Sequence, residues 1–335
     1  MAIKDTIKAL IISDSRIGHQ NQSIALCRWM NWDHIILPVK FRFPGARGAS
    51  LACDLTRVRP GFLVSSLANP YDMDGGPDVV IATGSRTYYA AKVVAARRRI
   101  PSIAILNPGI LAGGFDAIIV PDYENSMPRS KNLIKIPVNL SVPDEAMINE
   151  SLEELNRRLK VMDHKYWGII IGGENKTSHI DPEDLRNQLL MIRKHKPADV
   201  KLLATSSRRS GPVIEKLLAE MDFELLVQSS RDHYNPIPAF TRVCDRIFVT
   251  SDSASMISEV VTSGTAAVEI LMNRQKFEPN KFQKFINGLK HSGHLHVFDG
   301  AIGDARKKID LEKIRESVAA ATVARQSPNQ DISTP

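Results

Sequence analysis

The stretch from Arg246 to Gly264 reads RIFVTSDSASMISEVVTSG. It begins with an apolar, β-branched run, Arg246–Thr250, of the length typical of a buried strand. Small hydroxyl side chains follow, and then a helical stretch that contains Glu259. A strand that leads through small polar residues into a helix is one βα unit of an α/β protein, and ligands of such proteins bind beyond the carboxyl ends of the strands. We interpret this stretch as a strand exit and as a candidate nucleotide site.

Similar apolar runs recur on both sides of this stretch, separated by helical segments such as Arg86–Arg99, for which Ser85 is the expected cap. The alternation predicts parallel sheets, and the series starts afresh after residue 165, so we expect two Rossmann-like α/β domains. The predicted strands are Ala9–Ser13, His34–Val39, Asp78–Thr83, Ser102–Leu106, Ala117–Val120 and Leu133–Ile136 in the first half, and Tyr166–Ile171, Lys201–Thr205, Glu224–Gln228, Arg246–Thr250 and Ala267–Leu271 in the second.

The length of 335 residues also favours two domains, at roughly 150 residues each. We assign 1–143 to the first domain and 166–310 to the second. Residues 144–165 are charged and lack a strand pattern, which indicates a connector. An amphipathic helix over 311–325 and a polar, disordered tail over 326–335 complete the prediction.

Composition limits the classes of function. The net charge is +7, and the basic excess lies mostly before residue 145. Such an excess could attract an anionic lipid or a phosphorylated acceptor, or could simply make the surface soluble. No RNP-like, zinc-finger or helix-turn-helix pattern occurs, so nucleic acid is not an expected partner. No segment reaches about 18 uninterrupted apolar residues, and the first apolar run is too brief for a signal peptide. We therefore expect a cytoplasmic protein that can touch a membrane surface.

Neither a metal nor another cofactor is expected. The cysteines Cys27, Cys53 and Cys244 are widely spaced and should stay reduced. His294 and His296 lie close together, but no carboxylates are interleaved with them.

The loop after the first predicted strand, Ser13–Ser23, carries more hydrogen-bonding side chains than a turn requires. His19 can act as a general base near neutral pH, and Asp14 can orient it or serve in its place. Gly18 and Gln20 belong to the same loop, and we expect the next helix to begin only at its end. An Asx-turn with a helix cap is the plainer interpretation, but it accounts for only part of the loop.

Two further exits carry glycines. Gly84 and Ser85 stand between a strand and a helix, where backbone N–H groups favour an anionic or hydroxyl-rich group, although an ordinary tight turn explains them equally well. Gly172 and Gly173 end a strand of the second half, where the chain must turn sharply or approach a ligand closely.

Two loops of the second half suit a nucleotide. Thr205–Gly211 is rich in hydroxyls and arginine, and Arg208 is suited to a diphosphate because guanidinium offers a fork of donors; a solvated loop is the alternative. Ser253 and Glu259 can serve phosphate and ribose, or can merely cap a helix. The density of small polar residues around them favours the nucleotide site.

Several of these stretches together resemble the mitochondrial-fission ELM-type family, named after a plant factor. Bacterial members of that family are often labelled nucleoside-diphosphate-sugar epimerases or glycosyltransferases. The resemblance implies a GT-B architecture, in which two Rossmann-like domains face each other across a cleft. The matching stretches are Ser13–Gln22, Val80–Arg86, Gly172–Asn175, Thr205–Arg209 and Thr250–Gly264.

The last of these stretches is also similar to the nucleotide-binding stretch of GT-B enzymes of the peptidoglycan and lipid A transferase type. This similarity implies that Ser253, Ser255 and Met256 contact diphosphate or base and that Glu259 binds ribose. It also implies that the loop with Gly18 and His19 lies at the cleft, near the acceptor. The paired-Glu signature of many retaining enzymes is not matched, because the next glutamate is Glu269. An inverting reaction is therefore predicted.

The leading hypothesis is a glycosyltransferase that moves a sugar from a nucleotide-diphosphate donor to a cell-envelope glycan, such as lipopolysaccharide, or to a lipid-linked acceptor. Phe41–Phe43, with Arg42 at its centre, is a candidate membrane contact. An epimerase or hydrolase would instead consume the donor without an acceptor. A non-catalytic adaptor on the same fold would have no affinity for nucleotide.

Overall fold

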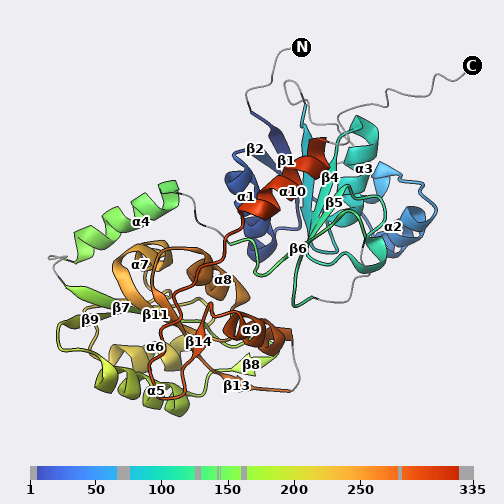
Figure 1. Ribbon diagram of the computed structural model, residues 1–335. Coiled ribbons are helices and arrows are strands. Elements are labelled where there is room, and N and C mark those ends of the chain that lie inside the picture. Colours follow the sequence, from blue (N-terminus) through green and yellow to red (C-terminus); the bar gives the residue numbers. More distant parts are fainter. Residues whose placement is uncertain are drawn as a thin grey trace, which may run out of the picture. The chain divides into compact units, whose positions relative to one another are not determined.

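The computed structural model describes residues 6–65, 76–124, 130–141, 143, 145–159, 164–277 and 281–323. The chain divides into two compact units: unit 1 comprises Met1–Leu140 and Leu311–Pro335, and unit 2 comprises Ser141–Asp310. Each unit is built on a six-stranded parallel sheet, which confirms the predicted pair of Rossmann-like α/β domains (Figure 1).

The sheet of unit 1 has the strand order β2-β1-β3-β4-β5-β6, and every neighbouring pair is parallel. All six strands were expected from the sequence. They are β1 (Lys8–Ser13), β2 (Asp33–Pro38), β3 (Val79–Thr83), β4 (Ser102–Ile105), β5 (Ala117–Pro121) and β6 (Leu133–Ile136). The helices are α1 (Ile17–Met30), α2 (Ala46–Leu55), α3 (Tyr88–Arg98) and α10 (Glu312–Val323), with the short 3-10 turns η1 (Gly61–Leu63) and η2 (Gly109–Leu111).

Both faces of this sheet are covered at its centre, which is why the strands β1, β3, β4 and β5 are largely apolar and buried. Alternate residues such as Leu10 and Ile12 pack with α2 and α3 on one face. The intervening residues, such as Ile11, pack with α1 and α10 on the other face (Figure 1). The C-terminal helix therefore completes the core of unit 1, although about 170 residues of unit 2 precede it in the chain.

The sheet of unit 2 has the order β10-β9-β7-β11-β12-β14. Helices α5 and α6 cover one face around Trp167 and Phe248, and α7 and α8 contact the central strands β7 and β11. Its strands are β7 (Lys165–Ile171), β9 (Val200–Ser206), β10 (Leu225–Val227), β11 (Cys244–Thr250), β12 (Ala267–Leu271) and β14 (His296–Val297). The helices are α4 (Glu145–Arg158), α5 (Pro182–His195), α6 (Gly211–Ala219), α7 (Ile237–Val243), α8 (Ala254–Thr262) and α9 (Lys281–His291), and β8 (Ser178–His179) pairs antiparallel with β13 (Arg274–Gln275).

Two local expectations at helix starts are wrong. Helix α1 begins at Ile17 rather than near Ser23, because the amides of His19 and Gln20 already donate to the Arg16 carbonyl. Ser85 does not cap α3, because the chain makes another turn first. Helix α3 begins after Thr87, whose hydroxyl donates to the Gly84 carbonyl at 2.8 Å.

The stretch expected to be a connector contains α4, which packs on α7 as part of unit 2. Its charged residues give the segment a polar outer face, while Ile148 and Leu155 are buried beneath it. The predicted disordered tail over 326–335 lies outside the described residues.

The docking of α10 can be tested at Val318, which is fully buried in the core between the sheet and α1. Val318→Asp is expected to lower the free energy of unfolding by about 3 kcal/mol or more, because it leaves a charge unpaired in an apolar core. Ser317→Asp, on the exposed side of the same helix, should change it by less than about 0.5 kcal/mol. Urea denaturation followed by tryptophan fluorescence measures both, and equal stabilities would contradict this role of α10.

Candidate functional site

The strand order creates a switch point in each sheet. In unit 2 the chain moves outward from β7 to β9 and β10 on one side, and from β11 to β12 and β14 on the other. In unit 1 it moves from β1 to β2 on one side and from β3 to β4 on the other. Because loops leave neighbouring strands in opposite directions at such a point, a crevice opens beyond the strand ends. The predicted site residues largely follow β7 and β11 in unit 2 and β1 and β3 in unit 1.

Asp252 joins the two central strand exits of unit 2. Its carboxylate accepts hydrogen bonds from the Gly173 amide at 2.9 Å and from the Thr250 hydroxyl at 2.7 Å. The same hydroxyl accepts from the Gly172 amide at 2.7 Å. Two of these hydrogen bonds hold the loop after β7 against the loop after β11, and the third fixes the Asp252 carboxylate on Thr250 within the β11 exit.

Two further side chains complete the shell of Asp252. Asn273 donates an amide N–H at 3.1 Å, and Arg209 donates a guanidinium N–H at 2.9 Å. The Asp252 side chain is fully buried, whereas Arg209 keeps about 43% of its side chain exposed. A buried carboxylate is tolerated only when its lone pairs are filled and its charge is compensated, and this shell does both.

Gly172 and Gly173 are required by this packing. A Cβ atom at Gly172 would stand 2.2 Å from the Asp252 carboxylate oxygens, and one at Gly173 would stand 2.0 Å from the Arg209 carbonyl oxygen. The sequence predicted a close approach at these glycines, and the structure shows that the approaching groups are Asp252 and the backbone of the β9 exit.

Helix α8 begins directly after this network. Ser253 is its N-cap and accepts a hydrogen bond from the Met256 amide at 3.4 Å. The amides of Ala254 and Ser255 occupy the first turn, where a helix leaves its N–H groups without intrahelical partners. Ser255 is exposed, and Ser253 and Met256 are half-buried. The start of α8 therefore presents donors and partial positive charge to the crevice side of β11.

Glu259 lies further along α8 and is half-buried. Within the described ranges, no hydrogen bond or ion pair holds its carboxylate. Burial raises the pKa of Glu259 to about 8. An acidic side chain without a partner, kept mostly protonated at neutral pH, is costly for the fold and is characteristic of functional positions.

Arg208 and Arg209 point to different places. Arg209 reaches Asp252, whereas Arg208 lines a separate hollow of about 550 Å³ together with Ser229 and Arg231. Glu215 also lines that hollow. Burial acts to raise the pKa of this carboxyl, but hydrogen bonds from neighbouring serines outweigh it and hold the pKa below its ordinary value.

In unit 1 the structure brings His19 and Asp14 together. The His19 Nδ1 atom lies 3.2 Å from one Asp14 carboxylate oxygen and 3.3 Å from the other. Gly84, at the exit of β3, has φ +88° and lies under the imidazole, and a Cβ atom there would stand 2.4 Å from the His19 Cε1 atom. The β1 and β3 exits therefore meet at the histidine ring, on the switch point of this sheet.

The other predicted residues of unit 1 surround this pair. Gln20 accepts a hydrogen bond from the Ser13 hydroxyl at 3.1 Å, and Gly18 is exposed in the first turn of α1. Ser85 is exposed, and its hydroxyl accepts from the Arg47 guanidinium at 3.3 Å.

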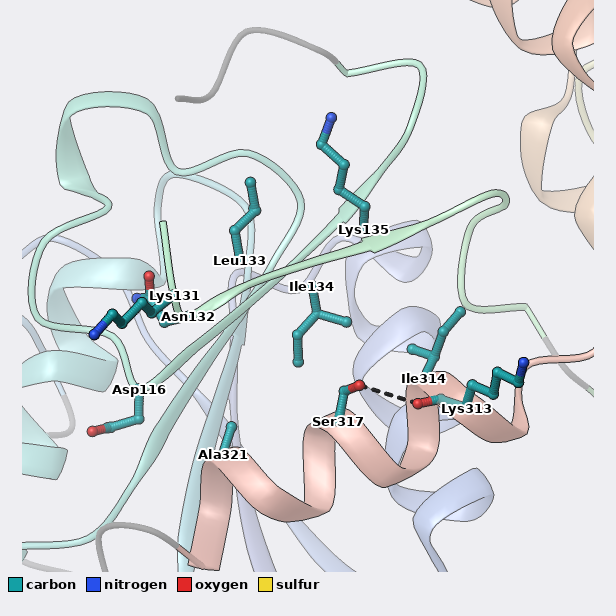
Figure 2. Close-up of a pocket in the computed structure, with 10 residues that line it drawn as sticks. All are labelled: Asp116, Lys131, Asn132, Leu133, Ile134, Lys135, Lys313, Ile314, Ser317 and Ala321. Carbon is teal, nitrogen blue, oxygen red and sulfur yellow. Dashed lines mark hydrogen bonds between the residues drawn. The ribbon is translucent and has the colours of Figure 1, made fainter. Parts of the chain in front are cut away.

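A hollow of about 790 Å³ lies elsewhere in unit 1, between the edge strand β6 and α10. Figure 2 shows Ile134 pointing toward α10, while Leu133 and Lys135 point away from it. Asp116 and Lys131, which also line the hollow, precede β5 and β6 in the chain. The hollow thus extends toward the amino ends of the strands, and none of the predicted site residues lines it.

The histidines near the C-terminus of unit 2 have structural partners. His296 lies 2.7 Å from the buried Glu269 carboxylate, which also pairs with Arg246. His294 contacts the Lys307 carbonyl at 2.9 Å. In the part of the chain that the structure describes, no three His, Cys, Asp or Glu residues form a group that could hold a metal ion.

Sequence reasoning missed Asp252, Asn273 and Arg209. Asp252 stands inside the stretch that was recognised as a strand exit, so its position was a usable signal. Asn273 follows β12 and Arg209 is the neighbour of Arg208, and only the strand order shows that both reach the end of β11.

Gly173→Ala tests the contact between the central strand exits. The new methyl group would collide with the Arg209 backbone, so we expect a loss of about 2 kcal/mol in the free energy of unfolding. Gly288→Ala is the control: it lies inside α9 with nothing near its Cβ position, and alanine there should stabilise unit 2 by about 0.5–1 kcal/mol. Denaturant unfolding of both variants measures the difference, and a neutral Gly173→Ala would refute the contact.

Solved structures of similar fold cover nearly the whole chain. A Listeria monocytogenes protein described as a candidate UDP-N-acetylglucosamine 2-epimerase shares 10% sequence identity, with 94% of this chain and 88% of that chain covered and a TM-score of 0.51. HepE of Anabaena, solved in complex with UDP-glucose, has 10% identity, 95% and 100% coverage and a TM-score of 0.49. The calicheamicin glycosyltransferase CalG4 has 9% identity, 96% and 94% coverage and a TM-score of 0.45. At these identities the similarity shows the fold, which is of the GT-B class.

No curated protein matches this sequence. The model of one protein family, described as Mitochondrial fission ELM1, matches residues 17–327, which is most of the chain and includes all of unit 2. The resemblance seen in the sequence is therefore confirmed, and this chain belongs to the Mitochondrial fission ELM1 family.

Proposed function

We propose that this protein is an inverting glycosyltransferase that takes a sugar from a nucleoside-diphosphate donor and transfers it to a glycan or a lipid-linked acceptor. The observation that carries the proposal is the exit of β11 in unit 2. There, a buried aspartate and two obligatory glycines fix the strand ends, and the donor-rich first turn of α8 follows directly. The same observation supports the more general proposal that the protein acts on nucleotide sugars.

The diphosphate of the donor would bind at the start of α8. The amides of Ala254 and Ser255 and the Ser253 hydroxyl supply neutral donors, and the helix end adds partial positive charge. Arg209 is already oriented by Asp252 and keeps exposed donors for the charge that develops as the diphosphate leaves. The structure favours Arg209 over Arg208 for this role, because only Arg209 reaches the β11 exit.

The nucleoside would extend along α8, with Met256 beside the base or the diphosphate and the Glu259 carboxylate on the ribose hydroxyls. Two ribose hydroxyls can supply the hydrogen bonds that Glu259 lacks among the described residues. The fold similarity to the Listeria protein, whose description names a UDP-sugar, supports UDP as the first nucleotide to test.

His19 would act as the base on the acceptor. With Nδ1 held by Asp14, the Nε2 atom of a neutral imidazole can take the proton from an acceptor hydroxyl. The oxygen of that hydroxyl attacks the anomeric carbon as the bond to the diphosphate breaks. Asp14 then stabilises the imidazolium that forms, as the acid does in other aspartate–histidine pairs.

An epimerase or hydrolase of nucleotide sugars is the second candidate. It is favoured by the description of the Listeria protein, and it needs the same nucleotide site. The two activities differ in one respect that can be measured: the epimerase or hydrolase acts on the donor alone, and the transferase requires an acceptor.

Glu259 makes nucleotide binding depend on pH. Because its pKa is raised to about 8, the carboxyl is mostly protonated at pH 7 and ionised at pH 9. Ribose hydroxyls donate to the ionised form, so UDP affinity should rise severalfold from pH 7 to pH 9 and release a proton on binding. Glu259→Gln should remove this dependence while leaving the ionisation of the phosphates in place as an internal control. Calorimetric titration in buffers of different ionisation enthalpy measures both effects, and an unchanged profile in the variant would exclude Glu259 as the ribose ligand.

His19→Ala should lower acceptor-dependent release of UDP from UDP-sugars by about 100- to 10,000-fold, without changing the affinity for UDP. Asp14→Asn should have a smaller effect in the same direction. His195→Ala, an exposed histidine at the end of α5, is the control. The measurement uses a panel of UDP-sugars with membrane extract as the source of acceptor. Donor consumption without extract would favour the second candidate, and absence of nucleotide binding would leave only the adaptor.

A further inference from the structure

Exposed apolar side chains gather around α2 in unit 1. Phe43, Leu55, Val58 and Phe62 are 46%, 68%, 61% and 58% exposed, and Ile110 is 71% exposed. These five are nearly half of the large apolar side chains that are exposed in the described chain. Such a concentration is unusual for the free surface of a water-soluble unit and marks a surface of interaction.

Backbone contacts bring these side chains onto one surface. Phe41 and Val64 form an antiparallel bridge, and the Arg42 amide donates to the Leu63 carbonyl at 3.1 Å. This pairing brings the segment that contains Phe43 next to the segment that contains Phe62. Helix α2, which ends at Leu55, contacts both η1, which contains Phe62, and η2, which contains Ile110. We call this surface the α2 patch.

The charges on the α2 patch are positive. Arg42, Arg47 and Arg57 are exposed, and no carboxylate within the described ranges pairs with them. The acidic side chain of this segment, Asp54, turns inward to the buried Lys92 and to Arg59, at 3.2 Å from the latter. The negative charge is thus neutralised inside the unit, and the patch offers exposed guanidinium groups that no carboxylate of the described residues pairs with, around apolar side chains.

We propose that the α2 patch docks on the surface of a bilayer that contains anionic lipid. Phenylalanine and leucine enter the boundary between headgroups and acyl chains, and the arginines bind lipid phosphates. Among the helices of the described residues, none has the length and apolar character needed to cross a membrane.

The patch borders the candidate acceptor residues. Arg47 donates to the Ser85 hydroxyl, and Ser85 follows Gly84, which lies under the His19 ring. Ile17, two residues before His19, is itself 54% exposed. This inference deepens the proposed function, on which its last step rests: an acceptor that enters beside His19 from a docked bilayer is a glycan carried on a lipid.

Vesicle flotation tests the docking directly. The full chain should bind vesicles in which about a third of the phosphatidylcholine is replaced by anionic phosphatidylglycerol. It should bind vesicles of pure phosphatidylcholine far more weakly. Phe43→Ser combined with Phe62→Ser should weaken binding roughly tenfold or more. Arg42→Gln combined with Arg57→Gln should weaken it by about fivefold for each arginine removed and should abolish most of its salt dependence.

The control variants carry matched changes on unit 2. Leu190→Ser removes a side chain that is 50% exposed on α5, and Lys194→Gln combined with Lys290→Gln removes two exposed charges. Both should bind vesicles like the unmodified chain. Equal binding by patch and control variants, or no binding by the unmodified chain, would overturn the proposal. Self-association that only the Phe43 and Phe62 changes abolish would identify a second copy of the chain as the occupant instead.

UDP titration of the same variants separates this inference from the proposed function. Patch variants that lose vesicles should keep UDP affinity, since the patch lies on unit 1 and the nucleotide residues on unit 2. If the unmodified chain binds vesicles but does not bind UDP, the proposed transferase is refuted and the docking proposal stands. The reverse result would refute the docking alone.

Discussion

The buried carboxylate of Asp252 is the constraint on which the rest of the proposed nucleotide site depends. An ionised side chain without water is stable only if every lone pair finds a donor, so its position fixes the positions of its donors. Here the donors come from the exits of β7, β9, β11 and β12, four strands of one sheet. The loops of unit 2 are therefore held by the geometry of hydrogen bonds as much as by apolar packing, and glycine at 172 and 173 follows from the space that the carboxylate and the β9 exit occupy.

Unit 1 also has an aspartate after a central strand, but its surroundings are chemically different. The histidine that this aspartate contacts is half-buried, and the Nε2 atom of the histidine has no hydrogen-bond partner among the residues that the structure describes. Gly84 removes the side chain that would displace the ring and leaves the imidazole held between two strand exits. A carboxylate whose oxygens already accept four hydrogen bonds can orient its neighbours but is not available to take a proton, whereas an aspartate–histidine pair with a second ring nitrogen is. This contrast is the physical basis for assigning donor binding to unit 2 and proton transfer to unit 1.

The sequence allowed prediction of those features that depend on local pattern. Continuous apolar runs predicted the central strands, because both faces of each sheet are covered. β14 was not predicted, since two residues that include His296 carry no periodicity, and its place is set by pairing with β12. The early start of α1 depends on the Arg16 carbonyl, which no composition rule identifies. The pairing of Asp14 with His19 is close in sequence and was foreseen, while the shell of Asp252 is distributed over about 100 residues and required the strand order.

The fold does not choose the acceptor, because one fold can carry unrelated functions. That choice must come from surfaces outside the two switch points, and in unit 1 the arginines around α2 are well placed to supply it. Arg47 belongs to both regions, since it starts the patch and holds Ser85 beside the histidine loop. Because a guanidinium carries five N–H donors, Arg47 can hold the Ser85 hydroxyl and still present donors to a lipid phosphate. In the proposed arrangement one side chain would therefore connect the α2 patch with the loop that lies beside His19.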